Sequence, residues 1–273
     1  MRSHLYVPAD QPNLLSRAET RGADAIIIDL EDSVAPGRKS DALEAALEFL
    51  ASARVGGQRW VRVNQGQLGL SEIGELTASG GLDGVWLPKV EPGEWASEAL
   101  ALLTTAGIRV GLLVESAAGL VGMPQLPALP SDTLGQLGEV DLAADLRMRD
   151  TSDEAMVPYR ARIIMECVIR GLAAPVAPVS VRYDQPDALR SSTTSLRDRG
   201  FGSRACIHPS QVAIVNEVFT PDAAERARAR AVVQEFEART GEGTGVYSDS
   251  SGAMVDHATV RWAYAVLENS GKP

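Results

Sequence analysis

The feature that most constrains the fold of this chain is an eightfold alternation of apolar runs and amphipathic stretches. The apolar runs span residues 4–9, 24–30, 59–64, 84–90, 109–115, 133–140, 175–181 and 204–209. They are apolar almost throughout, as is typical of parallel strands covered on both faces. Eight strand–helix units in residues 1–220 predict an α/β fold, a (β/α)₈ TIM barrel. The alternative is an open doubly wound sheet, which needs fewer strands. No G-x-G-x-x-G motif follows the first run to favour it.

The chain continues beyond the eighth unit. Residues 221–242 have the pattern of a long charged helix, and a short extended piece and a last helix follow. We therefore expect a catalytic barrel domain at 1–220 and a C-terminal helical extension at 221–273. That extension is expected to pack on the barrel or on a neighbouring subunit.

The formal net charge of −10 argues against a nucleic-acid partner and means that an anionic substrate must be met by local cations or a metal. No run of about 18 apolar residues predicts a membrane span. The N-terminus enters a strand-like pattern without a leader, so a cytoplasmic location is expected. Cys167 and Cys206 are interpreted as two buried thiols.

Polar residues close most of the apolar runs. In a (β/α)₈ barrel the carboxyl ends of the strands carry the active site, so we expect these side chains to converge: Asp29, Glu31, Asp32, Arg62, Asn64, Lys89, Glu115, Glu139, Asp141 and His208. The set is rich in carboxylates and poor in histidine and cysteine. Hard oxygen ligands favour Mg²⁺, with Mn²⁺ possible, over zinc.

Glu115 and Asp141, on adjacent strands, are the expected metal ligands. Arg62 has a planar fork that suits a substrate carboxylate, so metal plus arginine indicates a small oxyacid or ketoacid. Two alternatives stay open. Glu115 could pair with Arg62 or Lys89 in a structural ion network, and Asp141 could be an exposed acid at a helix start.

The stretches LYVPAD, DAIIIDLEDSV, WVRVN, GVWLPKV, LLVESAAGL, GEVDLAADL, GFGSRACIHPSQVAIVNEVF and GAMVDHATVRWA run in order from residue 5 to about 265. Together they resemble the citrate lyase beta subunit-like branch of the malyl-CoA lyase/HpcH-HpaI aldolase superfamily. The resemblance implies a barrel, a homotrimer or a multiple of one, Mg²⁺, and an acyl-CoA substrate.

The resemblance also implies roles for single residues. Glu115 and Asp141 match the metal ligands, Arg62 the arginine that grips the ketoacid, and Asp256 an acid/base that reaches a neighbouring subunit's site. The other matches are the acidic cluster of Asp29, Glu31 and Asp32, and two candidates for supporting or CoA contacts, Lys39 and Lys89. Relatives often have an acid where Val140 stands, so the resemblance leaves the identity of the substrate open.

The implied activity is that of a carbon–carbon lyase. It would cleave a 3-hydroxyacyl-CoA such as citryl-CoA or malyl-CoA into a ketoacid (oxaloacetate or glyoxylate) and acetyl-CoA, or form it by Claisen condensation. One alternative is a CoA-independent pyruvate/oxaloacetate aldolase. Another is a lyase subunit that is inactive without acyl-carrier partner subunits.

Overall fold

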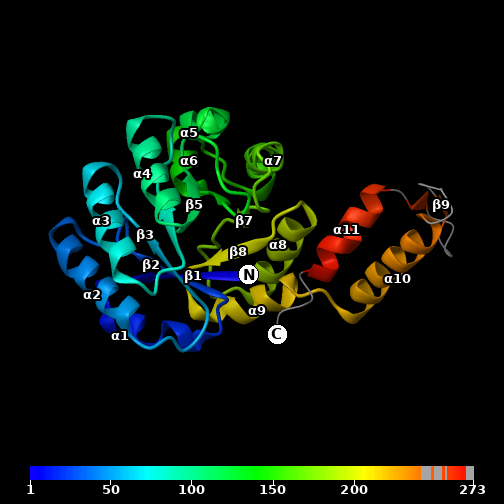
Figure 1. The fold of residues 1–273 in the computed structure, drawn as a ribbon, viewed down its shortest axis with the longest axis horizontal. Coiled ribbons are helices and arrows are strands. Elements are labelled where there is room, and N and C mark those ends of the chain that lie inside the picture. Colours follow the sequence, from blue (N-terminus) through cyan, green and yellow to red (C-terminus); the bar gives the residue numbers. More distant parts are fainter. Residues whose placement is uncertain (241–246, 249–253, 256, 269–273) are drawn as a thin grey trace. The chain divides into compact units, whose positions relative to one another are not determined.

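The computed structural model describes residues 1–240, 247–248, 254–255 and 257–268. Eight parallel strands pair in chain order and close into a barrel, with β8 hydrogen-bonded to β1 (Figure 1). The prediction of a (β/α)₈ barrel is therefore confirmed. The strands are β1 Ser3–Pro8, β2 Ala25–Asp29, β3 Gln58–Arg62, β4 Gly84–Leu87, β5 Arg109–Val114, β6 Leu134–Leu137, β7 Val176–Ala177 and β8 Ser203–Cys206.

Helices follow the strands and surround the barrel (Figure 1). They are α1 Pro12–Leu15, α2 Lys39–Ala51, α3 Gly66–Ser79, α4 Glu94–Thr105, α5 Ala117–Gly122, α6 Glu139–Asp145, α7 Asp153–Ile169, α8 Pro186–Asp198 and α9 Pro209–Phe219. Short 3₁₀ turns lie at η1 Ala18–Arg21, η2 Pro36–Arg38 and η3 Met123–Gln125.

The end of α2 is fixed by a buried arginine. The backbone is extended at Ser52, and Arg59 of β3 donates hydrogen bonds to the carbonyls of Phe49 and Leu50 in the last turn. These carbonyls have no partner inside the helix. The Arg59 guanidinium thus caps α2 from the neighbouring strand.

Two tryptophan rings fill the barrel interior. Trp60 and Trp86 are fully buried, with ring centroids 6.0 Å apart. Each faces a glycine of the next strand: a Cβ on Gly84 would lie 2.3 Å from Trp60, and one on Gly111 would lie 2.3 Å from Trp86. No ordinary contact is that short, so the rings fit only because both positions lack a side chain. The barrel is therefore packed below its C-terminal end.

Side chains along a strand alternate between its two faces, so residues two positions apart point the same way. Along the barrel strands this alternation places a core residue first and a cavity residue two positions later. Core side chains on seven strands each have a cavity residue two positions later. The core set is His4, Ile27, Trp60, Leu113, Leu134, Val176 and Ala205. The cavity set is Tyr6, Asp29, Arg62, Glu115, Gln136, Pro178 and Ile207. The site therefore rests on the tryptophan-filled core.

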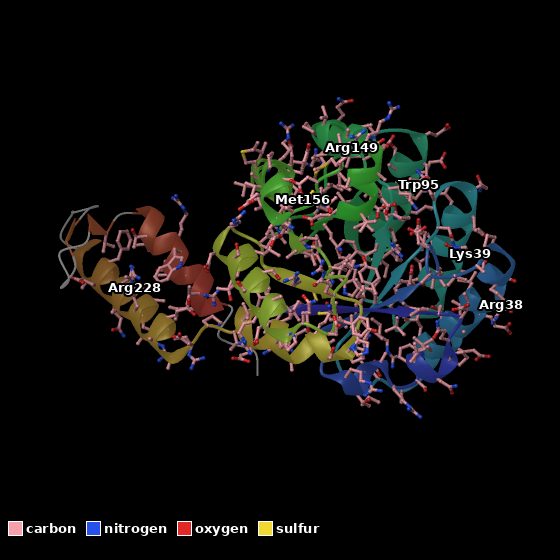
Figure 2. The ribbon with its side chains drawn as sticks, turned by 180° about the vertical axis from the view of Figure 1, so that it is seen from behind. Arg38, Lys39, Trp95, Arg149, Met156 and Arg228 are labelled. Atoms are coloured by element: carbon pink, nitrogen blue, oxygen red, sulfur yellow. The ribbon has the colours of Figure 1, made fainter. Side chains whose placement is uncertain are left out.

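The contacts divide the chain into Met1–Glu217 and Val218–Pro273. The second unit contains α10 Ala223–Thr240, α11 His257–Glu268 and the antiparallel pair β9 Tyr247–Ser248 and β10 Met254–Val255. Its helices pack through Val232, Val260 and Ala263. The Arg228 guanidinium lies 5.1 Å from the Trp262 ring centroid (Figure 2). The boundary at 220/221 and the packing of 221–273 on the barrel or another subunit stay predictions.

Both cysteines are buried free thiols, as the sequence indicated. Burial raises the pKa of each thiol to about 12, so neither is a nucleophile at neutral pH. Within the described residues, no helix combines the length and the apolar character that crossing a bilayer requires.

Candidate active site

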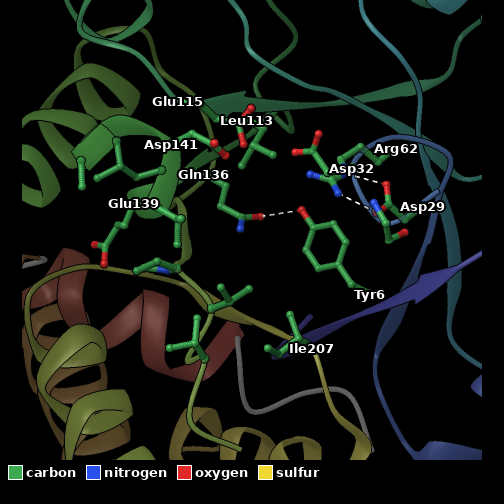
Figure 3. Close-up of a pocket in the computed structure, with 18 of the residues that line it drawn as sticks. Tyr6, Asp29, Asp32, Arg62, Leu113, Glu115, Gln136, Glu139, Asp141 and Ile207 are labelled. Atoms are coloured by element: carbon green, nitrogen blue, oxygen red, sulfur yellow. Dashed lines mark hydrogen bonds and ion pairs between the residues drawn. The ribbon is translucent and has the colours of Figure 1, made fainter. Parts of the chain in front are cut away.

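A cavity of about 660 Å³ lies at the C-terminal ends of the strands (Figure 3). Its polar lining consists of Tyr6, Asp29, Asp32, Ser33, Arg62, Glu115, Gln136, Glu139, Asp141 and Thr151. Its apolar lining includes Val140, Ala143, Met156, Pro178, Val179, Val181 and Ile207. One end of a ligand can thus meet charged groups while the rest lies against aliphatic side chains.

The Arg62 guanidinium is held by carboxylates along its edge and by an aromatic ring against its face. Its Nε and Nη2 donate to the two carboxylate oxygens of Asp29 at 2.7 and 2.6 Å, and its Nη1 lies 3.0 Å from Oε2 of Glu31. The guanidinium carbon is 5.2 Å from the ring centroid of Tyr6, a cation–π arrangement. Burial acts to lower the pKa of Arg62, but the hydrogen bonds to Asp29 and the coulombic attraction of Asp29, Tyr6 and Glu31 together outweigh it, and the pKa is raised. Arg62 is therefore a fixed cation with donors left for a ligand.

Lys89 contributes both its side chain and its backbone. Its Nζ bonds Glu31 and lies 3.1 Å from Oδ1 of Asp32. Its φ of 48° is unusual for a residue with a side chain. This conformation accompanies a hydrogen bond from its backbone N–H to Oε2 of Glu115 at 3.0 Å. Strained backbone of this kind is concentrated at functional sites.

Lys39 lies at the start of α2 (Figure 2). Its Nζ donates to the carbonyls of Leu30 and Glu31 at 2.8 and 2.6 Å. The ammonium thus secures the turn that follows β2.

Glu115 and Asp141 are the two cavity acids that no basic side chain neutralises. Within the described residues neither forms an ion pair, whereas Asp29, Glu31, Asp32 and Glu139 all do. Burial, followed by repulsion from Glu31 and Asp141, raises the pKa of Glu115 to about 7. The structural alternative, in which Arg62 or Lys89 pairs with Glu115, is therefore wrong for the side chains.

A hard divalent cation suits this pair of acids. The Glu115 carboxylate occupies the space beside Gly138, where a Cβ would lie 2.5 Å from its Cγ and 2.6 Å from its Oε1. The absent side chain leaves a cradle for the carboxylate. The part of the chain that the structure describes gathers no three His, Cys, Asp or Glu side chains into a complete metal cage. Mg²⁺ needs no such cage, because it usually takes one or two carboxylates and fills its shell with water and substrate oxygens.

Three other strand-end residues are occupied elsewhere. Glu139 accepts two hydrogen bonds from the buried Arg160, at 2.5 and 2.8 Å. Asn64 donates to Glu72 and to the Leu30 carbonyl. His208 Nδ1 lies 2.7 Å from the Ser210 hydroxyl, and its ring stacks on Tyr183. Of these, only Glu139 lines the cavity, and Arg160 neutralises it.

The structure brings most of the predicted residues together. Arg62, Glu115, Asp141, Asp29 and Asp32 line one cavity, with Glu31 and Lys89 joined to them by ion pairs. Asp141 does not end a strand, because β6 stops at Leu137 and Asp141 lies exposed in the first turn of α6. Asp256 lies outside the described residues.

Tyr6 and Gln136 are among the polar cavity residues that the sequence analysis missed. Both lie inside strands rather than after them. The signal that could have found them is the alternation itself, since each follows a core residue by two positions, as Asp29 and Arg62 do.

Comparison with known proteins adds three relatives. The family model described as HpcH/HpaI aldolase/citrate lyase matches residues 2–209. The citrate lyase subunit beta-like protein of Deinococcus radiodurans is 30% identical, over 98% of this chain and 97% of that protein. The (3S)-malyl-CoA thioesterase of Cereibacter sphaeroides is 31% identical, over 90% and 86%. The crystal structure of CitE from Mycobacterium tuberculosis, in complex with magnesium, acetoacetate and coenzyme A, has a TM-score of 0.80, 26% identity, and coverage of 99% and 98%.

Proposed function

The chain belongs to the HpcH/HpaI aldolase/citrate lyase family, and from that premise we propose that it is a Mg²⁺-dependent carbon–carbon lyase. It cleaves a 3-hydroxyacyl-CoA such as citryl-CoA or malyl-CoA to a ketoacid and acetyl-CoA, or runs the reverse condensation. The observation that carries the proposal is the pair of unneutralised acids, Glu115 and Asp141, in one cavity with Arg62.

In the proposed site Glu115 and Asp141 hold the metal. When bound, the ion supplies Lewis-acid polarisation of the substrate oxygen that becomes the ketone. Support for magnesium comes from the CitE structure, which contains magnesium with coenzyme A, and from the all-oxygen donor set.

Arg62 binds the carboxylate of the ketoacid portion with the donors that Asp29 and Glu31 leave. Because Asp29 and the Tyr6 ring already fix the guanidinium, little reorganisation is needed when the substrate arrives.

Cleavage breaks the bond between the hydroxyl-bearing carbon and the carbon next to the thioester. The hydroxyl gives its proton to solvent as its oxygen becomes the carbonyl oxygen of the ketoacid, and the electron pair of the broken bond passes to the thioester carbon unit, which takes up one proton to become acetyl. Asp256 is the proposed acid for that protonation. As proposed, it acts from the C-terminal segment of a neighbouring subunit in a homotrimer or a multiple of one.

Thioester hydrolysis is a second candidate, favoured by the 31% identity to a (3S)-malyl-CoA thioesterase. The two reactions leave different products. A lyase releases a ketoacid and keeps the thioester in acetyl-CoA, whereas a thioesterase releases free CoA thiol and a hydroxy acid.

The test incubates the purified chain with malyl-CoA and with citryl-CoA, with Mg²⁺ and with a chelator, and measures ketoacid and free thiol. We expect ketoacid without thiol, only with Mg²⁺. Free thiol with malate would favour hydrolysis. Cleavage of a free hydroxy-ketoacid alone would favour the CoA-independent aldolase, and activity only with an acyl-carrier protein would favour the subunit alternative.

Three variants test the residue roles. Glu115→Ala and Asp141→Ala should each abolish Mg²⁺-dependent turnover, while Asp256→Ala should remove turnover and leave Mg²⁺ affinity unchanged. Retained Mg²⁺-dependent activity in both metal-ligand variants would overturn the assignment of the metal site.

A further inference from the structure

A neutral polar pair on the cavity lining has no part in the chemistry described so far. Tyr6 of β1 and Gln136 of β6 come from strands separated by β7 and β8, and the Tyr6 hydroxyl donates to Oε1 of Gln136 at 3.4 Å (Figure 3). Both line the cavity. The bond is longer than usual for an O–H donor, so the two groups are close without satisfying each other fully.

The amide nitrogen of Gln136 has hydrogen-bonding capacity that the described residues do not use. Gln136 is 3% exposed, and its Nε2 donates to no other group among the described residues. A primary amide offers two N–H donors, and the Gln136 side chain lines the cavity that would receive a ligand. A donor that bonds no other described residue and faces the cavity is available to an acceptor that the cavity receives.

The surroundings define what that acceptor can be. The core layer beneath the pair is apolar, and Leu113 lies beside Gln136 in the register of β5 and β6. The Tyr6 ring is fixed under the Arg62 guanidinium. The hydroxyl and the amide therefore face a region next to the group that Arg62 binds, and neither carries a charge at neutral pH. Their ligand is an oxygen that accepts hydrogen bonds.

We propose that Tyr6 and Gln136 form a binding subsite for an acceptor oxygen of the substrate, beyond the carboxylate that Arg62 holds. The inference rests on the proposed function for the identity of that substrate. Two oxygens fit the chemistry: the second carboxylate of a dicarboxylic ketoacid such as oxaloacetate, and the thioester carbonyl. A two-carbon ketoacid such as glyoxylate has neither.

The variants are Tyr6→Phe, which keeps the ring under Arg62, and Gln136→Met, which keeps the length of the side chain. Gln125→Met, at an exposed position in η3, is the matched control. Calorimetry with Mg²⁺ present gives the dissociation constants of oxaloacetate and glyoxylate, and kinetics give kcat and KM on the acyl-CoA that the wild type cleaves. Thermal unfolding and Mg²⁺ affinity should match the control, which a merely structural role would not predict together with a binding defect.

We expect Tyr6→Phe and Gln136→Met each to lose about tenfold or more in binding, the size of one hydrogen bond to a site built for it. Weaker oxaloacetate binding with unchanged glyoxylate binding assigns the subsite to the second carboxylate. Unchanged binding of both, with a fall in kcat/KM on the acyl-CoA, assigns it to the thioester carbonyl.

The inference is overturned if both variants stay within about twofold of Gln125→Met in every measurement, or if both ketoacids weaken equally. The binding measurements also distinguish failure of the subsite from failure of the proposed function. A wild-type protein that binds oxaloacetate through this pair but cleaves no acyl-CoA refutes the proposed function and keeps the subsite. Normal cleavage by both variants, together with unchanged oxaloacetate binding, refutes the subsite and keeps the function.

Discussion

Replacing Gly138 with alanine would place a methyl group where the Glu115 carboxylate now lies. The new Cβ would be 2.5 Å from Glu115 Cγ, and ordinary contact begins at 3.4 Å, so the carboxylate has to retreat by about 0.9 Å. The backbone itself accepts alanine, because Gly138 has a φ of −85° and a ψ of 87°. All of the perturbation therefore falls on Glu115.

A shift of that size exceeds what Mg²⁺ tolerates, since its oxygen ligands lie near 2.0–2.1 Å in close to ideal geometry. Changes in groups that orient a metal ligand typically cost about 10- to 100-fold in metal affinity, which is about 1.4–2.7 kcal/mol. We expect Gly138→Ala to weaken Mg²⁺ binding by this factor. The strain in the folded protein should not exceed about 1–3 kcal/mol.

The assay is calorimetric titration of the metal-free protein with Mg²⁺, together with urea unfolding. The control is Gly74→Ala in α3, where an added Cβ meets nothing within 4 Å and the intrinsic helix preference favours alanine by about 1 kcal/mol. Mg²⁺ affinity of Gly138→Ala within about threefold of the control would refute the reasoning, because Glu115 would then either not bind the metal or move without cost.

Two further predictions concern stability. The raised pKa of Glu115, about 7 against an ordinary value near 4.3, means that ionisation opposes folding. That penalty is absent below the ordinary value, grows as the pH rises and is complete above 7. Glu115→Gln should therefore raise the unfolding free energy of the metal-free protein at pH 8, by up to roughly 3 kcal/mol, and little at pH 4; no gain at pH 8 contradicts this. Arg59→Leu should cost about 3–5 kcal/mol in urea unfolding, because it leaves the buried Glu19 carboxylate without its ion pair and removes donors from the last carbonyls of α2. Arg38→Ala, which removes an exposed pair with Asp41, should cost under about 0.5 kcal/mol, and equal costs would contradict the capping role of Arg59.

The sequence was sufficient for the barrel because eight largely apolar runs alternate with amphipathic stretches. It placed strand ends less well. The run 133–140 overshoots, since Gly138 leaves the sheet and α6 begins at Glu139. The run 175–181 reduces to Val176–Ala177, because Pro175 and Pro178 have no N–H for the sheet.

The site was predictable as a set of residues but not as a set of partners. Counting strand ends brought Arg62, Glu115 and Asp141 into one cavity. Which acid each cation would take depends on contacts across strands: Arg62 with Asp29, Lys89 with Glu31 and Asp32, and Arg160 with Glu139. Those choices leave Glu115 and Asp141 without an ion pair among the described residues, and no spacing in the chain encodes them.

The two indole rings that fill the barrel interior have a consequence for the order in which products leave. Because the core closes one end of the cavity, ligands enter and leave at the other end. The ligand that binds deepest therefore binds first and leaves last. If the ketoacid rests on the floor beside Arg62 and the thioester lies above it, acetyl-CoA must exit before the ketoacid can escape. Catalytic order would then be imposed by Trp60 and Trp86, two side chains that touch neither molecule.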